Sequence, residues 1–111
     1  MFKLKSIKYN KLVRDHIPEI IEKSGDKCVI EILSEEKYLE MLDKKLDEEL
    51  TEYHKEKNLE ELADLLEVIY ACTEARGYSL EDLENIRAFK AEYRGGFTKK
   101  ILLKETILKD D

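Results

Sequence analysis

The spacing of apolar side chains predicts helices over most of the chain. After Ser34, which can cap a helix, apolar residues recur at intervals of three and four. These are Leu39, Leu42, Leu46, Leu50 and Tyr53. The spacing predicts a long helix with a single apolar stripe, and Glu35 and Glu36 favour its positively polarised start.

A second helical segment follows almost at once. Asn58 interrupts the first pattern and can cap a helix from Leu59 to about Arg76, which stops at Gly77. This segment is apolar around most of its circumference. We therefore expect it to be the central, buried helix of the fold.

Shorter helices are predicted on either side of this pair. Asp15 can cap a helix running to about Ser24, with Pro18 in the first turn, where a missing N–H is tolerated. Ser79 can cap a fourth helix that runs to about residue 93 or 94, where a glycine pair ends it. Residues 1–14 are basic and are expected to form a loop.

Two segments have the composition of strands rather than helices. KCVIEIL at residues 27–33 is short and β-branched, and KILLKETIL at residues 100–108 is a second candidate. In a chain that is otherwise helical, two strands would pair with each other. The expected fold is thus all-α, a four-helix bundle with a small two-stranded antiparallel ribbon.

Composition and charge limit the class of protein. The chain has 111 residues, of which 42% are hydrophobic and 41% charged, consistent with one soluble domain over residues 1–111. The net charge of −6 argues against a nucleic-acid partner. The pattern holds neither a secretory signal nor an apolar run long enough to span a membrane. Cys28 and Cys72 lie in apolar runs and are expected to be reduced thiols in the cytoplasm.

Acidic residues border the apolar stripe of both long helices. In the first helix Glu49 lies at the edge of the stripe, Glu52 is the next acid outward, and Glu48 points towards solvent. In the second helix Glu61 and Asp64 lie within or beside the apolar arc. Acids three apart on a helix share nearly the same face. Each helix is therefore expected to turn a pair of carboxylates towards apolar neighbours.

Converging carboxylates need a cation. Ionised acids near a core each cost several kcal/mol unless they are neutralised, and no basic residue occupies those interior helix positions. Oxygen ligands suit Mg²⁺, or Mn²⁺ as a substitute, whereas Zn²⁺ would favour Cys or His. A simpler interpretation remains open. Glu61 occupies the capping-box position after Asn58, Glu52 can pair with Lys55, and helix acids are commonly solvated.

Two basic pairs could contact an anionic ligand. Lys90 and Arg94 lie four apart on one face of the last helix, just before Gly95. Lys11 and Arg14 form the second pair. Both pairs could equally be ordinary surface residues, and Arg14 could pair with Asp15 or another acid.

The acid pattern, with its flanks, resembles a known superfamily. Glu48-Glu49-x-x-Glu52 followed by Glu61-x-x-Asp64 is similar to the signature of the all-α nucleoside triphosphate pyrophosphatases, the MazG-like proteins. YNKLVRDHIPEII at residues 9–21 and KAEYRGGFTKKILL at residues 90–103 resemble the ends of a compact house-cleaning, phosphoribosyl-ATP pyrophosphohydrolase-like branch. The eight residues between the acid pairs are fewer than the family generally has, which shortens the turn between the helices.

The resemblance implies a fold, an activity and a site. The fold would be a MazG-like helical bundle. The homodimer or higher homo-oligomer that we expect has a separate basis, because so apolar a central helix in a short chain needs a partner to cover it. The activity would be Mg²⁺-dependent hydrolysis of a nucleoside triphosphate between the α and β phosphates, giving a monophosphate and pyrophosphate. The implied metal ligands are Glu49, Glu52, Glu61 and Asp64.

Several points stay open within this resemblance. Glu48 or Glu67 could substitute as a ligand, and the catalytic base could be Glu48 or a ligand acid such as Glu49. Phosphoribosyl-ATP is an alternative substrate. A non-catalytic helical interaction module on the same fold is an alternative function.

Overall fold

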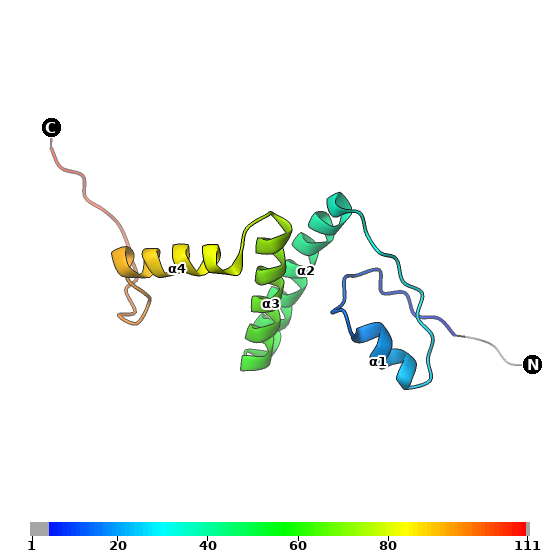
Figure 1. Ribbon diagram of the computed structural model, residues 1–111. Helices are drawn as coiled ribbons and strands as arrows, with labels where there is room; N and C mark the ends of the chain where they lie inside the picture. The colour runs from blue at the N-terminus through cyan, green and yellow to red at the C-terminus, as the bar shows by residue number, and fades with distance from the viewer. Residues whose placement is uncertain (1–4, 111) are drawn as a thin grey trace, which may run out of the picture. The chain divides into compact units, whose positions relative to one another are not determined.

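The computed structural model describes residues 5–110, and residues 1–4 of the predicted basic loop lie outside them. This part of the chain holds four α-helices and no strand. Figure 1 shows how the chain runs through these helices. The all-α prediction is confirmed at this level. The chain divides into one unit that ends at Tyr78 and a second that begins at Ser79.

A tight helical hairpin dominates the first unit. Helix α2 spans Glu35–Glu56 and α3 spans Leu59–Ala75, and the two pack side by side (Figure 1). Lys57 ends α2 in the left-handed conformation, with φ 50° and ψ 39°. Asn58 then begins α3, its side-chain oxygen accepting a hydrogen bond from the Glu61 backbone N–H at 2.9 Å. The chain therefore reverses direction within two residues, which brings the acids of both helices to one end of the hairpin.

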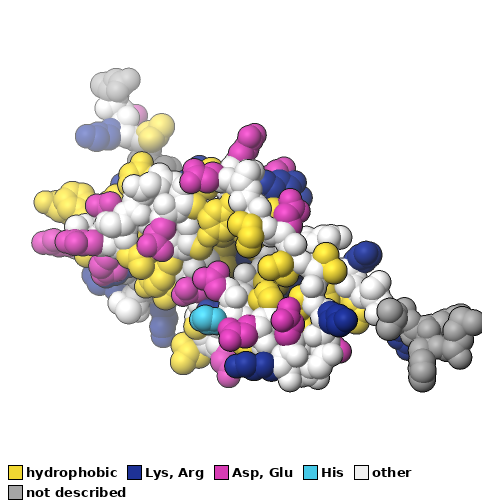
Figure 2. Space-filling model, turned by 45° about the vertical axis from the view of Figure 1, so that its right-hand side comes forward, with side chains coloured by type: hydrophobic (Ala, Val, Ile, Leu, Met, Phe, Trp, Pro, Cys, Tyr) yellow, Lys and Arg dark blue, Asp and Glu magenta, His cyan; other side chains and the backbone are white. Residues whose placement is uncertain are grey.

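The core of this hairpin is small. Among the described residues only Leu42 of α2 and Val68 of α3 are buried, with 3% and 8% of their surface exposed. Leu59, Leu62 and Leu66 of α3 remain exposed. The expectation that α3 is a buried central helix is wrong for a single copy, because only α2 covers it within this unit. Apolar side chains are correspondingly visible among the charged ones on the surface in Figure 2.

Helix α1 differs from its prediction at its start. It spans Ile17–Lys23, and the residue at its N-cap is His16 rather than Asp15. No side chain caps this end. Pro18 does fall in the first turn, where it breaks no helical hydrogen bond.

Helix α4 forms as predicted in the second unit. It spans Leu80–Arg94, and its start is a complete capping box. The Ser79 hydroxyl accepts from the Asp82 N–H, while the Asp82 carboxylate accepts from the Ser79 N–H. Gly95 follows at φ 82°, a conformation that favours glycine.

The predicted strands do not form. Residues 27–33 and 100–108 carry no strand, so the described part of the chain contains no antiparallel ribbon. A β-branched composition favours a strand only where a partner supplies the other half of the hydrogen-bond ladder. Within the described residues of the first unit, the helices in contact are α2 and α3 alone. No helix in residues 5–110 has the length and apolar character needed to cross a bilayer.

Candidate metal centre

Three carboxylates from the two paired helices converge near the hairpin turn. One oxygen from each of Glu49, Glu61 and Asp64 lies within 4.8 Å of the others, and all three residues are half-buried. Glu49 comes from α2, and the other two lie one helical turn apart at the start of α3. The spacing of three and the tight turn therefore bring together three of the four predicted ligands.

Glu61 is the acid of this group that has no cation beside it. Its backbone N–H is bound by Asn58, but its carboxylate makes no hydrogen bond or ion pair within residues 5–110. The reciprocal half of the capping box is therefore missing in α3. Partial burial, followed by the charges of Asp64, Glu52 and Glu49, raises the pKa of the Glu61 carboxyl.

Lys45 neutralises two of the acids on α2, Glu48 and Glu49. Lys45 Nζ lies 3.2 Å from Glu49 Oε1 and 3.4 Å from Glu48 Oε1, and the Lys45 and Glu49 side chains are only 15% and 12% exposed. The absence of a basic residue at the interior helix positions therefore does not leave these acids without a cation. The spacing of three and four between Lys45 and the two glutamates was a sequence signal that could have revealed this pair.

The segment before α1 brings two more cations to the hairpin. Arg14 Nη2 donates to Asp64 Oδ1 at 2.7 Å, and Lys11 Nζ donates to Glu48 Oε1 at 2.9 Å. The open alternative that Arg14 pairs with an acid is thus confirmed, although Asp15 is not that acid. No local pattern could have indicated contacts between residues so distant in sequence.

Glu48 is held in place rather than turned freely to solvent. Partial burial opposes its ionisation, but the hydrogen bond from Lys11 and the charge of Lys45 outweigh that effect and lower the pKa of the Glu48 carboxyl. The same contact raises the pKa of the Lys11 ammonium. The interpretation of Glu48 as a solvent-facing acid is therefore wrong.

The remaining predicted ligands lie outside the closest group. Glu52 is half-buried and near enough to Glu61 to raise the pKa of that carboxyl, but it is not one of the three converging acids. Glu67, an alternative ligand, is exposed on α3 and is likewise outside the group. In this structure the site is three acids with a fourth nearby.

The donor set suits a hard cation. All three side chains offer oxygen, the atom that Mg²⁺ prefers, and opposite ligands of one Mg²⁺ ion are about 4.2 Å apart. The separations of up to 4.8 Å therefore need only small side-chain adjustments. Lys45 and Arg14 offset part of the negative charge, but within residues 5–110 no ion pair neutralises Glu61, whose neighbours are acidic. The donor atoms and their spacing are compatible with Mg²⁺.

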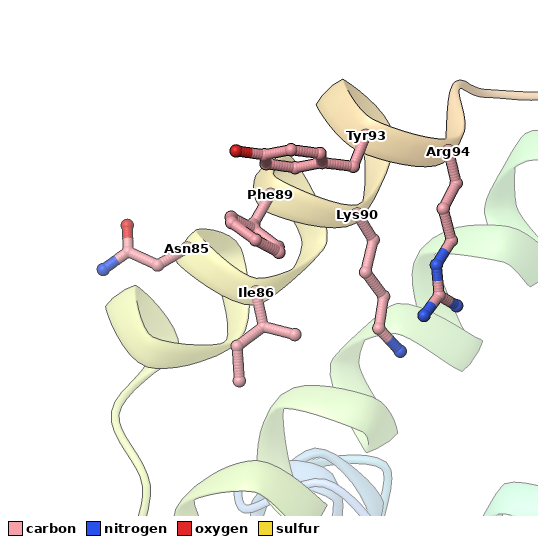
Figure 3. A pocket seen from close by; sticks show the side chains of 6 residues that line it. All are labelled: Asn85, Ile86, Phe89, Lys90, Tyr93 and Arg94. Atoms are coloured by element: carbon pink, nitrogen blue, oxygen red, sulfur yellow. The ribbon is translucent and has the colours of Figure 1, made fainter.

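The other predicted basic pair lies in the second unit. Lys90 and Arg94 extend to the same side of α4, beside the aromatic rings of Phe89 and Tyr93 (Figure 3). The centroids of these two rings are 4.5 Å apart, and their planes are tilted by 41°. Together with Ile86 and Asn85 they line an open pocket of about 330 Å³ on this helix. Lys90 and Arg94 stay predicted substrate residues.

Comparison with known proteins gives one partial match. An uncharacterized protein of Mycolicibacterium smegmatis is 56% identical over 41 residues, which is 37% of this chain and 42% of that protein. The chain therefore spans less than half the length of this relative. No protein-family model matches the sequence, and no solved structure matches it.

Proposed function

We propose that this protein is a Mg²⁺-dependent nucleotide pyrophosphohydrolase of the MazG-like superfamily. It would cleave a nucleoside triphosphate, standard or modified, between the α and β phosphates to a monophosphate and pyrophosphate. The observation that supports this best is the convergence of Glu49, Glu61 and Asp64 from two antiparallel helices. The resemblance of the acid pattern and of both chain ends supplies the reaction.

The chain's own residues have distinct roles in this proposal. Glu49, Glu61 and Asp64 would hold the ion, with Glu52 as a fourth acid nearby. Bound Mg²⁺ would supply charge neutralisation at the phosphate oxygens. Arg14 and Lys11 already lie at the acids, with side chains 55% and 42% exposed, so their donors are accessible to a phosphate group.

The attacking water needs a base from the same set of acids. Glu48 and Glu49 are the candidates, and their Oε1 atoms lie 3.4 Å and 3.2 Å from Lys45 Nζ. Because no nucleophilic side chain is required, we propose direct attack by water without a covalent enzyme intermediate. A phosphorylated or nucleotidylated protein trapped during turnover would rule this out.

Pyrophosphate release tests the activity. The purified chain would be incubated with a panel of standard and modified nucleoside triphosphates and phosphoribosyl-ATP, with Mg²⁺ or with a chelator. The Glu61→Gln, Asp64→Asn double variant should lose Mg²⁺-dependent release. The Glu60→Gln, Glu74→Gln double variant should retain it, because it removes two exposed charges from the same helix. Pyrophosphate release from phosphoribosyl-ATP alone would identify that compound, rather than a nucleoside triphosphate, as the substrate.

A non-catalytic interaction module is the second candidate, and one observation favours it. Arg14 and Lys45 already pair with Asp64 and Glu49, as they would in a purely structural charge network. Such a module would release no pyrophosphate from any substrate. It would also keep its fold and partners when Glu61 and Asp64 are replaced by their amides.

We also propose that the protein acts as a homodimer or higher homo-oligomer. Leu62 and Leu66, one turn apart on α3, are 44% and 45% exposed although they belong to an apolar helix. A second copy could cover this surface.

Light scattering at tens of micromolar should give at least twice the 13.1 kDa mass of one chain. The Leu62→Gln, Leu66→Gln double variant should have a lower measured mass than wild type. A monomeric wild-type chain would contradict the proposal.

A further inference from the structure

Arg14 forms an ion pair with Asp64, which is one of the three converging acids. Its Nη2 atom donates to Asp64 Oδ1 at 2.7 Å, and Asp64 lies within 4.8 Å of both Glu49 and Glu61. Lys11, from the same segment, contacts Glu48, which is outside that group. Of the two basic residues, Arg14 is therefore the one that is paired with a carboxylate of the converging group.

A guanidinium and a divalent ion cannot share this position without repulsion. The oxygen that accepts the Arg14 hydrogen bond is unavailable for short coordination from the same direction. At a separation of about 5 Å in a water-like dielectric, a unit positive charge weakens binding of a divalent ion by about tenfold. A bare ion therefore has to displace Arg14 or bind against its charge.

A triphosphate changes this balance. Arginine binds phosphate oxygens in a planar, bidentate arrangement that a single carboxylate contact does not match. The Arg14 side chain is 55% exposed, and residues 5–13 carry no helix or strand, so a ligand can reach it from solvent. A phosphate that arrived with an ion would offer Arg14 a new partner and free Asp64.

We propose that Arg14 is an internal cation that keeps free divalent ions out of the acid cluster and is transferred to the phosphates of an arriving metal–nucleotide complex. The inference rests on the proposed function for the identity of that ligand. It makes Arg14 a positioning residue with two partners: Asp64 before the ligand arrives and a phosphate oxygen afterwards. The physiological ligand is then the metal–triphosphate complex rather than the free ion.

Binding of Mn²⁺ to the full chain, followed by the electron paramagnetic resonance of the free ion, tests this directly. Four proteins are compared: wild type, Arg14→Gln, Arg14→Lys and Lys8→Gln. Arg14→Gln should bind Mn²⁺ about tenfold more tightly than wild type. Arg14→Lys keeps the charge and should resemble wild type. Lys8→Gln removes an exposed charge from the same segment and should change the affinity by less than about twofold.

The second arm adds an α,β-methylene triphosphate analogue, which cannot be cleaved at the relevant bond. It should tighten Mn²⁺ binding to wild type by a larger factor than to Arg14→Gln, because only wild type must release Asp64. An equal factor in both proteins would overturn the transfer to phosphate. Equal Mn²⁺ affinity without nucleotide would overturn the exclusion of free ions.

These outcomes separate the inference from the proposed function. If wild type releases pyrophosphate but Arg14→Gln binds Mn²⁺ no more tightly, the proposed activity is supported and the proposed role of Arg14 is contradicted. If Arg14→Gln gains affinity for Mn²⁺ but no triphosphate is cleaved, the competition between Arg14 and the ion is supported and the proposed activity is contradicted. Failure of all four proteins to bind Mn²⁺ would overturn both.

Discussion

Arg14 and Asp64 are fifty residues apart in sequence, yet they form a 2.7 Å hydrogen bond between a guanidinium and a carboxylate. This contact ties the segment before α1 to the start of α3, beside the acids of α2. Two positions that the sequence indicated separately, as a substrate cation and a metal ligand, are thus a single charge pair in the protein.

Glu61 should make the metal-free protein less stable as pH rises. The folded state raises the pKa of its carboxyl above the ordinary 4.5, so folded protein binds the proton more tightly than unfolded protein. The contribution of the Glu61 carboxyl to the free energy of unfolding is highest below pH 4.5 and falls as pH rises through the raised pKa. Glu61→Gln should therefore be more stable than wild type at pH 7 in chelator.

Urea unfolding of wild type and Glu61→Gln from pH 4 to 8 shows which of the two is more stable at each pH. Glu60→Gln is the matched control, since it removes an exposed charge from the neighbouring position. Lower stability of Glu61→Gln than of wild type at pH 7 would mean that the Glu61 carboxylate has a cationic partner, contrary to the structure.

Lys11 and Glu48 should contribute modestly to stability above acid pH. Both side chains are partly exposed, at 42% and 32%, so solvent screening limits the loss in Lys11→Met to below about 1 kcal/mol. Because the fold lowers the pKa of Glu48 below 4.5, this contribution is present above that value and is lost as pH falls through the lowered pKa. The stability difference between wild type and Lys11→Met should shrink at low pH and in high salt. A difference independent of both would contradict the ion-pair origin.

Leu42 should dominate the small core of the hairpin. It is 3% exposed, and Leu42→Ala should lower the free energy of unfolding by about 2–4 kcal/mol through lost burial and a residual cavity. Leu50→Ala on the same helix, where Leu50 is 44% exposed, should cost less than about 1 kcal/mol. Thermal and urea unfolding compare the two. Equal losses would indicate that Leu50 is covered by a partner in solution.

Lys57 should be replaceable by glycine with a gain in stability. A residue with a side chain at φ 50° costs about 1–2 kcal/mol, which glycine avoids, while the more flexible unfolded chain returns part of that gain. We expect Lys57→Gly to raise the unfolding free energy by about 0.5–1 kcal/mol. Lys57→Ala loses the same charge but keeps Cβ, and should stay within about 0.5 kcal/mol of wild type. A gain for alanine equal to that for glycine would attribute the effect to charge.

Local patterns in the sequence were enough to predict the main helices. Ser34, Asn58 and Ser79 begin α2, α3 and α4 as predicted, because a capping side chain acts on backbone groups only two or three residues away. The same local reasoning placed Glu49, Glu61 and Asp64 on facing helix surfaces, since helical periodicity and a short turn together determine which residues can meet.

Two local features were missed, the pairing of Lys45 with Glu48 and Glu49 and the N-cap of α1 at His16. The other errors fall where distant parts of the chain have to meet. Residues 27–33 and 100–108 have strand composition but form no strand in the described chain, because a ladder depends on a partner segment rather than on composition. Likewise, only the tertiary structure pairs Arg14 with Asp64 and Lys11 with Glu48. The sequence by itself determined the helices and the convergence of the acids. The tertiary structure decided that Arg14 and Lys11 pair with these acids and that no ion pair reaches Glu61 within residues 5–110, because ion pairs across many residues depend on how the chain folds back on itself.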